Sequence, residues 1–518
     1  MNQTQKIDAL FQLWQQGLCP GGQILVRQKG EVIYENNFGY ANLEHQIPIT
    51  VDTVFHVASV SKQVTALAIL LLQEEGKLNI DDDVRNYLPE LIHFAEPVSL
   101  RQMMNMVSGI RDQWLALIYH GVRIDDTITM RDTANIISLQ KNLNFAPGSR
   151  YLYSNSNFSL LAMIVEKLSG QSFGNFTKQR IFTPLGMDST SIRETYWQLI
   201  NKRAYAYHDN GEGVFTWNVL NYGTYGATSL HTTARDLMKL LDHYRTPKIG
   251  KPETMALMMQ RPTLADGKLS IYGGGLQFGT YQGHVYLEHG GADAAFRAHV
   301  MRLMEDDLDI VLLSNTQSMP MSLLARKIAN IILNLPEETP DLKEYESEED
   351  LLPVAGNYLN LSGPEAFLIE EKDGLFYRGE IPLRHIKGNR YRLGYGLTEV
   401  MVCPDKLVSV TGATVTVFPF SPDRKVDKAF AENCCGTYHS DEIACDYQIS
   451  EKDGYLWISH FRHGSHRLYS LADVKDSYFA WNKDFNGVFH FQKDQNGRVT
   501  GLQLDGGRIL GLQLQKIN

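Results

Sequence analysis

Ser59-Val60-Ser61-Lys62 stands directly before a strongly apolar stretch of the sequence. In residues 62–75 the apolar side chains recur at helical spacing, and Gly76 follows as a stop signal. The pattern predicts a helix that is drawn into a hydrophobic core, with Ser59 at its start and Lys62 one turn later. Residues 59–76 therefore decide the fold and the function that we predict for the first part of the chain.

A serine and a lysine three positions apart at a helix start can act as a nucleophile and its base. Positions i and i+3 share a helix face, so the amine can approach the hydroxyl. The backbone amide of Ser59 would lie at a helix N-terminus, where partial positive charge favours an oxyanion. Burial can lower the pKa of Lys62 far enough to make it a base near neutral pH. Ser59 is therefore the candidate nucleophile.

The S-x-x-K pattern occurs a second time, at Ser138-Leu139-Gln140-Lys141. The alternative interpretation of either match is a helix cap followed by a solvated lysine. Only the first match opens a strongly apolar helix, which would draw its lysine toward a core. The sequence therefore favours Ser59 and Lys62 over Ser138 and Lys141.

Tyr153-Ser154-Asn155 precedes a second apolar helical pattern, residues 158–168, and Gly170 ends that pattern. The phenol and the carboxamide, two positions apart, can project together from a turn. The same Y-x-N spacing occurs at Tyr34 and at Tyr358, so the spacing alone does not identify a site.

His289-Gly290-Gly291-Ala292 lies between two predicted strands. Glycines at this point would let a substrate lie close to the backbone, and the amide of Ala292 could donate to an oxyanion. A lone histidine beside glycines is otherwise typical of an ordinary turn.

Taken in order, S-x-x-K, Y-x-N and H-x-G resemble the motifs of class C serine β-lactamases, D-alanyl-D-alanine carboxypeptidases and their esterase relatives. The resemblance covers about residues 5–335, and over the whole chain it is greatest to the bacterial D-aminopeptidases, which carry two C-terminal antiparallel barrels. It implies that Ser59 is the nucleophile and that Lys62 and Tyr153 handle its proton. It also implies that Asn155 binds the substrate amide, that Gly290 and Gly291 line the substrate site, and that the Ser59 and Ala292 amides form the oxyanion hole.

The chain departs from this group at two places. His289 stands where many relatives have lysine, and a mostly neutral imidazole should hold a substrate carboxylate less firmly. This favours D-peptides and esters over carboxypeptidase and β-lactamase substrates. The D-aminopeptidases also use a loop of the last domain to shape the amine pocket, whereas residues 481–489 leave only a short turn around Asn486-Gly487.

The second half of the chain differs in pattern from the first. Residues 1–335 mix helices and strands, residues 336–350 are crowded with acidic side chains, and short alternating strand patterns follow. Gly356-Asn357-Tyr358 and Glu371-Lys372-Asp373-Gly374 recur 80 residues later as Gly436-Thr437-Tyr438 and Glu451-Lys452-Asp453-Gly454. We therefore predict an α+β fold: a class C β-lactamase-like domain at 1–335, a linker at 336–350, and two small lipocalin-like antiparallel β-barrels at 351–430 and 431–518.

Composition limits the partners. The 518 residues are 43% hydrophobic with a net charge of -10, which is typical of a soluble globular protein and disfavours nucleic acid. The most apolar run is too short to span a membrane, and the N-terminal residues have no secretory pattern, so a cytoplasmic location is expected. Five cysteines without paired spacing imply neither disulfides nor a zinc site. No metal and no cofactor are expected.

The leading hypothesis is a serine hydrolase that forms an acyl-enzyme with D-amino-acid peptides or amides, or with small esters. One alternative is carboxypeptidase or β-lactamase-like activity, and another is a non-catalytic sensor that binds a ligand in the same fold. No G-x-S-x-G elbow or H-E-x-x-H helix supports other hydrolase classes. The partner would be a small molecule or short peptide, and the sequence is compatible with a homo-oligomer.

Overall fold

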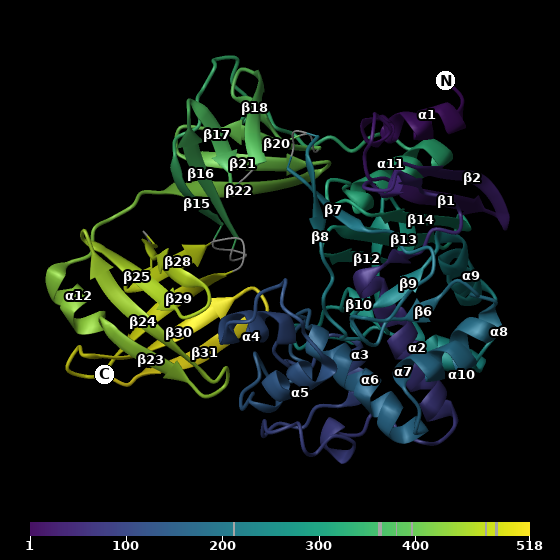
Figure 1. Cartoon of the computed structure of the whole chain (residues 1–518), viewed down its shortest axis with the longest axis horizontal. Helices are drawn as coiled ribbons and strands as arrows, with labels where there is room; N and C mark the ends of the chain where they lie inside the picture. The colour runs from purple at the N-terminus through teal and green to yellow at the C-terminus, as the bar shows by residue number, and fades with distance from the viewer. Residues whose placement is uncertain (211–212, 361–364, 380, 395–396, 472–473, 482–484) are drawn as a thin grey trace.

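A seven-stranded antiparallel sheet organises the first part of the chain (Figure 1). The computed structural model describes residues 1–518 except 211–212, 361–364, 380, 395–396, 472–473 and 482–484. The strands of the sheet, in spatial order, are β10 (Tyr272–Gly273), β11 (Leu276–Tyr281), β12 (His284–Asp293), β13 (Phe296–Leu303), β14 (Leu308–Ser314), β1 (Gly22–Gln28) and β2 (Glu31–Phe38). β1 inserts between β14 and β2, and Gly22 pairs with Ser314. The beginning and the end of this part are therefore joined in one sheet.

Helices cover both faces of the sheet. On one face lie α1 (Gln3–Leu10) and α11 (Met321–Leu333), which share a hydrophobic core with β1, β13 and β14. The other face carries α9 (Ala234–Arg245) and, beyond it, α2 (Lys62–Glu74) against α6 (Asn155–Ser169). Every residue of α2 from Lys62 to Leu72 is buried, as expected for a helix that is apolar on all sides. The predicted core helix is confirmed.

Shorter elements fill the space around these helices. The helical ones are η1 (Gln12–Trp14), η2 (Ala58–Ser61), η3 (Val84–Asn86), α3 (Leu100–Met104), α4 (Gln113–His120), α5 (Met130–Ser138), α7 (Phe173–Thr177), η4 (Lys178–Phe182), α8 (Thr183–Leu185), α10 (Pro252–Met258) and α12 (Lys428–Cys434). The small sheets pair β3 (Tyr40–Asn42) with β4 (Ile47–Pro48), β9 (Leu230–Thr232) with both β5 (Phe55–His56) and β6 (Ser191–Ile192), and β7 (Ala206–Asp209) with β8 (Phe215–Asn218). None of the helices in the described part of the chain has the length and apolarity that a membrane crossing requires.

Two antiparallel sheets follow. The first is a closed barrel of β15 (Gly356–Asn360), β16 (Glu365–Lys372), β17 (Leu375–Arg378), β18 (Ile381–Lys387), β19 (Arg390–Leu393), β20 (Thr398–Val402), β21 (Lys406–Thr411) and β22 (Thr414–Ser421). The second is a nine-stranded, barrel-like sheet of β26 (Gly464–Arg467), β25 (Tyr455–His460), β24 (Cys445–Lys452), β23 (Gly436–Ser440), β31 (Ile509–Lys516), β30 (Val499–Gly506), β29 (Asn486–Lys493), β28 (Ser477–Trp481) and β27 (Tyr469–Ser470). The predicted fold class is confirmed.

The internal repeat has the same local structure in both sheets. Tyr358 and Tyr438 each donate a hydrogen bond to the carbonyl four residues earlier, that of Val354 at 3.0 Å and that of Cys434 at 2.6 Å. The two Asp-Gly pairs, 373–374 and 453–454, each have both φ angles positive, from 54° to 86°. Positive φ at both central residues is the requirement of a tight hairpin turn, which Asp-Gly meets at little cost. The repeated Asp-Gly pairs therefore form the same kind of tight turn in both sheets.

The nine-stranded sheet is docked on the first part of the chain by a buried ion pair. Arg111 Nη1 lies 2.7 Å from Glu442 Oε2, and their side chains are 2% and 7% exposed. Glu442 Oε1 also accepts hydrogen bonds from the backbone amides of Lys141 and Asn142. Figure 1 shows this end of the yellow sheet against α4. The contact fixes the last sheet beside the segments that surround α4.

Glu442→Ala should loosen this docking, because it leaves Arg111 buried without its counter-charge. Loss of one partner of a buried pair typically costs about 3–5 kcal/mol. Hydrogen–deuterium exchange should speed up at Lys141 and Asn142, whose backbone amides donate to Glu442. Asp441→Ala is the matched control, since Asp441 pairs with Lys141 in solvent, where an ion pair is worth about 0–1 kcal/mol. Equal exchange in the two variants would contradict this account of the docking.

Candidate active site

Ser59 lies in a tight turn rather than in the regular helix. η2 holds it in a 3-10 turn, and α2 begins only at Lys62. The preceding Ala58 has a φ of 47°, a left-handed conformation that is costly for a residue with a Cβ. Ser61 Oγ donates to the Ala58 carbonyl and accepts from the Leu230 amide, so this second serine is used to hold the turn. The hydroxyl of Ser59, in contrast, is only partly buried.

Lys62 is fully buried and its amine is surrounded by three oxygen atoms. Lys62 Nζ lies 3.0 Å from Ser59 Oγ, 2.8 Å from Asn155 Oδ1 and 2.7 Å from the Ala227 carbonyl. Burial, and next the nearby Arg508 charge, hold the pKa of Lys62 well below its usual value. The amide and carbonyl oxygens can only accept, so a neutral amine would donate its two hydrogens to them. Its lone pair would then face the Ser59 hydroxyl.

Asn155 connects Lys62 to a carboxylate that the sequence analysis did not single out. Its backbone amide and its Nδ2 both donate to Asp112 Oδ2, each at 2.7 Å. The other oxygen of Asp112 accepts from the Trp114 and Leu115 amides and so caps α4. An aspartate directly before an apolar helical segment is a recognisable N-cap signal, but nothing in the sequence connects it to Asn155. Both polar groups of the Asn155 side chain are therefore engaged within the protein.

Tyr153 lies on the other side of the nucleophile. It is hydrogen-bonded to Ser59, and Lys62 Nζ lies 4.8 Å from the centre of its ring. Burial raises the pKa of the Tyr153 phenol, so the phenol keeps its proton at neutral pH. The Ser59 hydroxyl is thus within hydrogen-bond reach of a phenol that keeps its proton, Tyr153, and of an amine whose lowered pKa lets it accept one, Lys62.

His289 is neutral and fixed in one tautomer. Burial, and next the proximity of Lys62, lower the pKa of His289 to about 3. Its Nδ1 lies 2.7 Å from the Gly290 carbonyl, which can only accept, so Nδ1 carries the hydrogen. Nε2 then accepts from the Tyr272 hydroxyl at 2.9 Å. Tyr272, fully buried, is a second residue of the site that no sequence motif indicates.

The last residues of β12 lie beside η2, the turn that holds Ser59, and one edge of the strand is not paired with β11 there. β11 pairs with β12 only as far as Glu288, so the edge from His289 to Asp293 is not covered by that strand. A Cβ at Gly291 would lie 2.2 Å from the Val57 carbonyl, so the glycine lets β12 pack against the turn itself. The same addition at Gly290 would meet only an ordinary contact, and Ala292 is exposed. The structure thus brings together all of the predicted site residues.

Comparison with known proteins identifies the family of the chain. The model of the beta-lactamase family matches residues 7–333, well over half of the chain. The chain belongs to the beta-lactamase family. The "D-aminopeptidase" of Gluconobacter oxydans is 30% identical over 303 residues, which are 58% of this chain and 56% of that enzyme. The alignment therefore spans little more than half of that relative.

Other relatives of this beta-lactamase family member cover more of its length. "Penicillin-binding protein 4*" of Bacillus subtilis is 26% identical over 72% of this chain and 87% of its own. Among solved structures, the octameric penicillin-binding protein homologue from Pyrococcus abyssi has a TM-score of 0.55 at 20% identity and covers 96% of both chains. A D-amino acid amidase from Ochrobactrum anthropi has a TM-score of 0.54 at 21% identity and covers 64% of this chain and 99% of its own. These two structures share the fold.

Two other candidate features lie away from this site. Ser138, at the end of α5, donates to the Asn135 carbonyl, and Lys141 is exposed and pairs with Asp441. The second S-x-x-K match is therefore a helix end with a solvated lysine. The predicted short turn at 481–489 includes residues 482–484, which lie outside the described residues. Within the described part, no group of three or more histidine, cysteine or acidic side chains is arranged to hold a metal ion.

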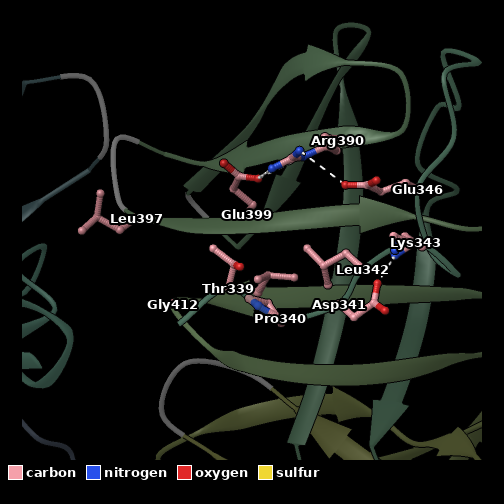
Figure 2. Close-up of a pocket in the computed structure, with 11 residues that line it drawn as sticks. Thr339, Pro340, Asp341, Leu342, Lys343, Glu346, Arg390, Leu397, Glu399 and Gly412 are labelled. Carbon is pink, nitrogen blue, oxygen red and sulfur yellow. Dashed lines mark hydrogen bonds and ion pairs between the residues drawn. The ribbon is translucent and has the colours of Figure 1, made fainter. Parts of the chain in front are cut away.

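A pocket of about 450 Å³ lies between residues 339–346 and the closed barrel (Figure 2). Figure 2 shows Arg390 between Glu346 and Glu399, with which it forms ion pairs. No serine–lysine pair lines this pocket. It therefore lacks the pair on which the candidate site at Ser59 is built.

Proposed function

We propose that this chain is a serine hydrolase that acts, through an acyl-enzyme on Ser59, on D-amino-acid peptides or amides and on small esters. The observation that carries the proposal is the buried Lys62 amine, 3.0 Å from the Ser59 hydroxyl and with a lowered pKa. Support for the substrate class comes from the relatives, which include several D-aminopeptidases and a D-amino acid amidase.

Acylation would begin with the neutral Lys62 amine. As Ser59 Oγ attacks the substrate carbonyl, Lys62 takes its proton, and the carbonyl oxygen becomes an oxyanion between the Ser59 and Ala292 amides. The phenol of Tyr153 donates its proton to the leaving nitrogen, and the carbon–nitrogen bond breaks. Tyr153 recovers a proton from Lys62, and the acyl group remains on Ser59 as an ester. Asn155 and Asp112 would hold the Lys62 amine in position throughout.

Deacylation would reverse these roles with water as the nucleophile. Lys62, neutral again, takes a proton from water as the water oxygen attacks the ester carbonyl. The oxyanion collapses, Ser59 Oγ leaves with a proton, and the free acid is released. The substrate would lie along the open edge of β12, where backbone groups beyond Glu288 have no β11 partner.

We also propose a cytoplasmic location and self-association of the chain. A cytoplasmic location is supported by the five cysteines, all of which are free thiols. Self-association is suggested by the octameric relative named above. Cell fractionation and light scattering of the purified chain test the two proposals.

A matched set of substrates tests the proposed function. We expect kcat/KM for D-alanine p-nitroanilide to exceed that for the L-enantiomer at least tenfold, and p-nitrophenyl acetate to be hydrolysed as well. A chromogenic cephalosporin should be turned over more slowly than the D-anilide, since the relatives that support the substrate class are D-aminopeptidases and a D-amino acid amidase. Turnover of none of these compounds would favour the non-catalytic sensor, and preference for the cephalosporin would favour β-lactamase activity.

A further inference from the structure

The turn between β30 and β31 of the last sheet reaches the candidate active site. The carbonyl of Arg508 accepts hydrogen bonds from the Asp112 amide at 3.4 Å and from Asn144 Nδ2 at 3.0 Å. A Cβ at Gly506 would lie 1.9 Å from the Tyr119 hydroxyl, so the turn fits tightly against α4. In Figure 1 the yellow end of β31 lies beside α4. The position of Arg508 relative to Ser59 is thus fixed by backbone contacts.

The guanidinium of Arg508 lies against the outer side of Tyr153. Its Cζ is 4.7 Å from the centre of the Tyr153 ring, while Lys62 Nζ is 4.8 Å from the same centre. The nearest acid is Asp112, whose Oδ2 is 3.9 Å from Arg508 Nη1 and already accepts two hydrogen bonds from Asn155. The Arg508 side chain remains 47% exposed, and its guanidinium donates no hydrogen bond to any described residue. Its N–H groups are therefore available to a ligand.

Arg508 also supplies a charge that the rest of the site lacks. His289 is neutral, with a pKa lowered to about 3, and Lys62 is buried and bonded to three protein oxygens. Of the site residues described above, Arg508 alone carries a permanent positive charge on a partly exposed side chain. A planar guanidinium with free donors is suited to a carboxylate, which it can bind through two parallel hydrogen bonds.

We infer that Arg508 binds a carboxylate on the leaving group of the substrate, so that short D-peptides with a free C-terminus are preferred to the corresponding amides. The inference rests on the proposed function, in which Tyr153 protonates the leaving nitrogen. Since Arg508 lies against Tyr153, a charge carried just beyond that nitrogen would come within its reach. The last sheet would thus contribute a specificity residue to a site that belongs otherwise to the first part of the chain.

Kinetics on a matched substrate pair tests this role. We expect D-alanyl-D-alanine to have a higher kcat/KM than D-alanyl-D-alaninamide, and Arg508→Gln to reduce the ratio of the two values about 10- to 100-fold, mainly through KM. Arg508→Lys should restore part of the ratio. Arg498→Gln removes the same charge at the other end of β30, where Arg498 is exposed, and should leave the ratio unchanged.

The kcat/KM values of the two substrates are compared at a pH where the rate of each variant no longer depends on pH, because Arg508 also lowers the pKa of Lys62. Without the Arg508 charge the acid limb of kcat/KM should move to higher pH for both substrates. If Arg508→Gln lowers kcat/KM equally for the peptide and the amide, or lowers neither value, the ratio does not change and the inference is overturned. Equal losses would assign Arg508 to positioning or tuning Lys62.

Binding to a protein without the nucleophile separates this inference from the proposed function. In the Ser59→Ala background, calorimetry should show at least tenfold tighter binding of D-alanyl-D-alanine than of its amide. Arg508→Gln in that background should abolish the difference. If the unmodified enzyme hydrolyses neither compound but this preference is present, the proposed function fails while the carboxylate subsite stands. Equal binding of the two ligands before the Arg508 change would overturn the subsite.

Discussion

Ser59→Ala is expected to lower kcat/KM for the D-anilide by at least about 10⁴-fold, because it removes the hydroxyl that we propose carries the acyl group. Loss of the nucleophile in serine hydrolases is of this size or larger, and the residual rate comes from binding and the oxyanion donors. The substitution removes one oxygen of a partly exposed residue within η2 and should leave the fold intact. Steady-state kinetics together with a thermal unfolding curve measures both effects.

Ser138→Ala is the matched control for this change. Ser138 has the same S-x-x-K pattern but lies at the end of α5, where it donates to the Asn135 carbonyl and not to a residue of the site. It should retain the activity of the unmodified enzyme. Retention of activity by Ser59→Ala, or an equal loss in both variants, would show that the first match is not the reactive one.

Lys62→Met is expected to lower kcat/KM by about 10²- to 10⁴-fold, the usual contribution of a general base. The thioether has nearly the length of the lysine side chain but cannot accept the Ser59 proton. Lys62→Arg should lose a similar factor, because a guanidinium stays protonated at every accessible pH. Lys141→Met, at the exposed second match, is the control and should have no such effect.

The same side chain sets the expected pH dependence. Only neutral Lys62 accepts a proton, so kcat/KM should rise with pH and level off above its pKa. Burial, and next the Arg508 charge, place that pKa well below the ordinary value for lysine. The plateau should therefore be reached at a lower pH than an exposed lysine would allow. A rate that keeps rising until the ordinary lysine range, or a pH limb that Lys62→Met retains, would contradict this role.

Local patterns were sufficient to predict the core helix and the two repeated antiparallel domains. The apolar spacing after Lys62 predicted a buried helix because a helix surrounded by other elements must be apolar on all sides, and α2 is buried from Lys62 to Leu72. The repeat at an offset of 80 residues predicted two similar antiparallel domains, and its Asp-Gly pairs form tight turns because few other residues accept positive φ at two successive positions. In both cases the residues that determine the local structure lie within a few positions of one another in the sequence.

Contacts between distant segments could not be predicted in this way. Asp112 reaches Asn155 only because α4 and α6 pack together, and Arg508 reaches Tyr153 only because the last sheet docks through Arg111 and Glu442. Neither contact has periodicity or spacing in the sequence. The expectation of a weakened carboxylate site, drawn from His289 alone, therefore took no account of a cation supplied from the other end of the chain.

The central claim is that Ser59 becomes acylated by substrate, and trapping the acyl-enzyme tests it most directly. The protein is mixed with excess D-alanine p-nitrophenyl ester, quenched in acid within milliseconds to seconds, and weighed intact before peptide mapping. We predict one added D-alanyl group per chain, located on Ser59, absent from Ser59→Ala and present in Ser138→Ala. Turnover without any covalent adduct, or an adduct on another residue, would contradict the account.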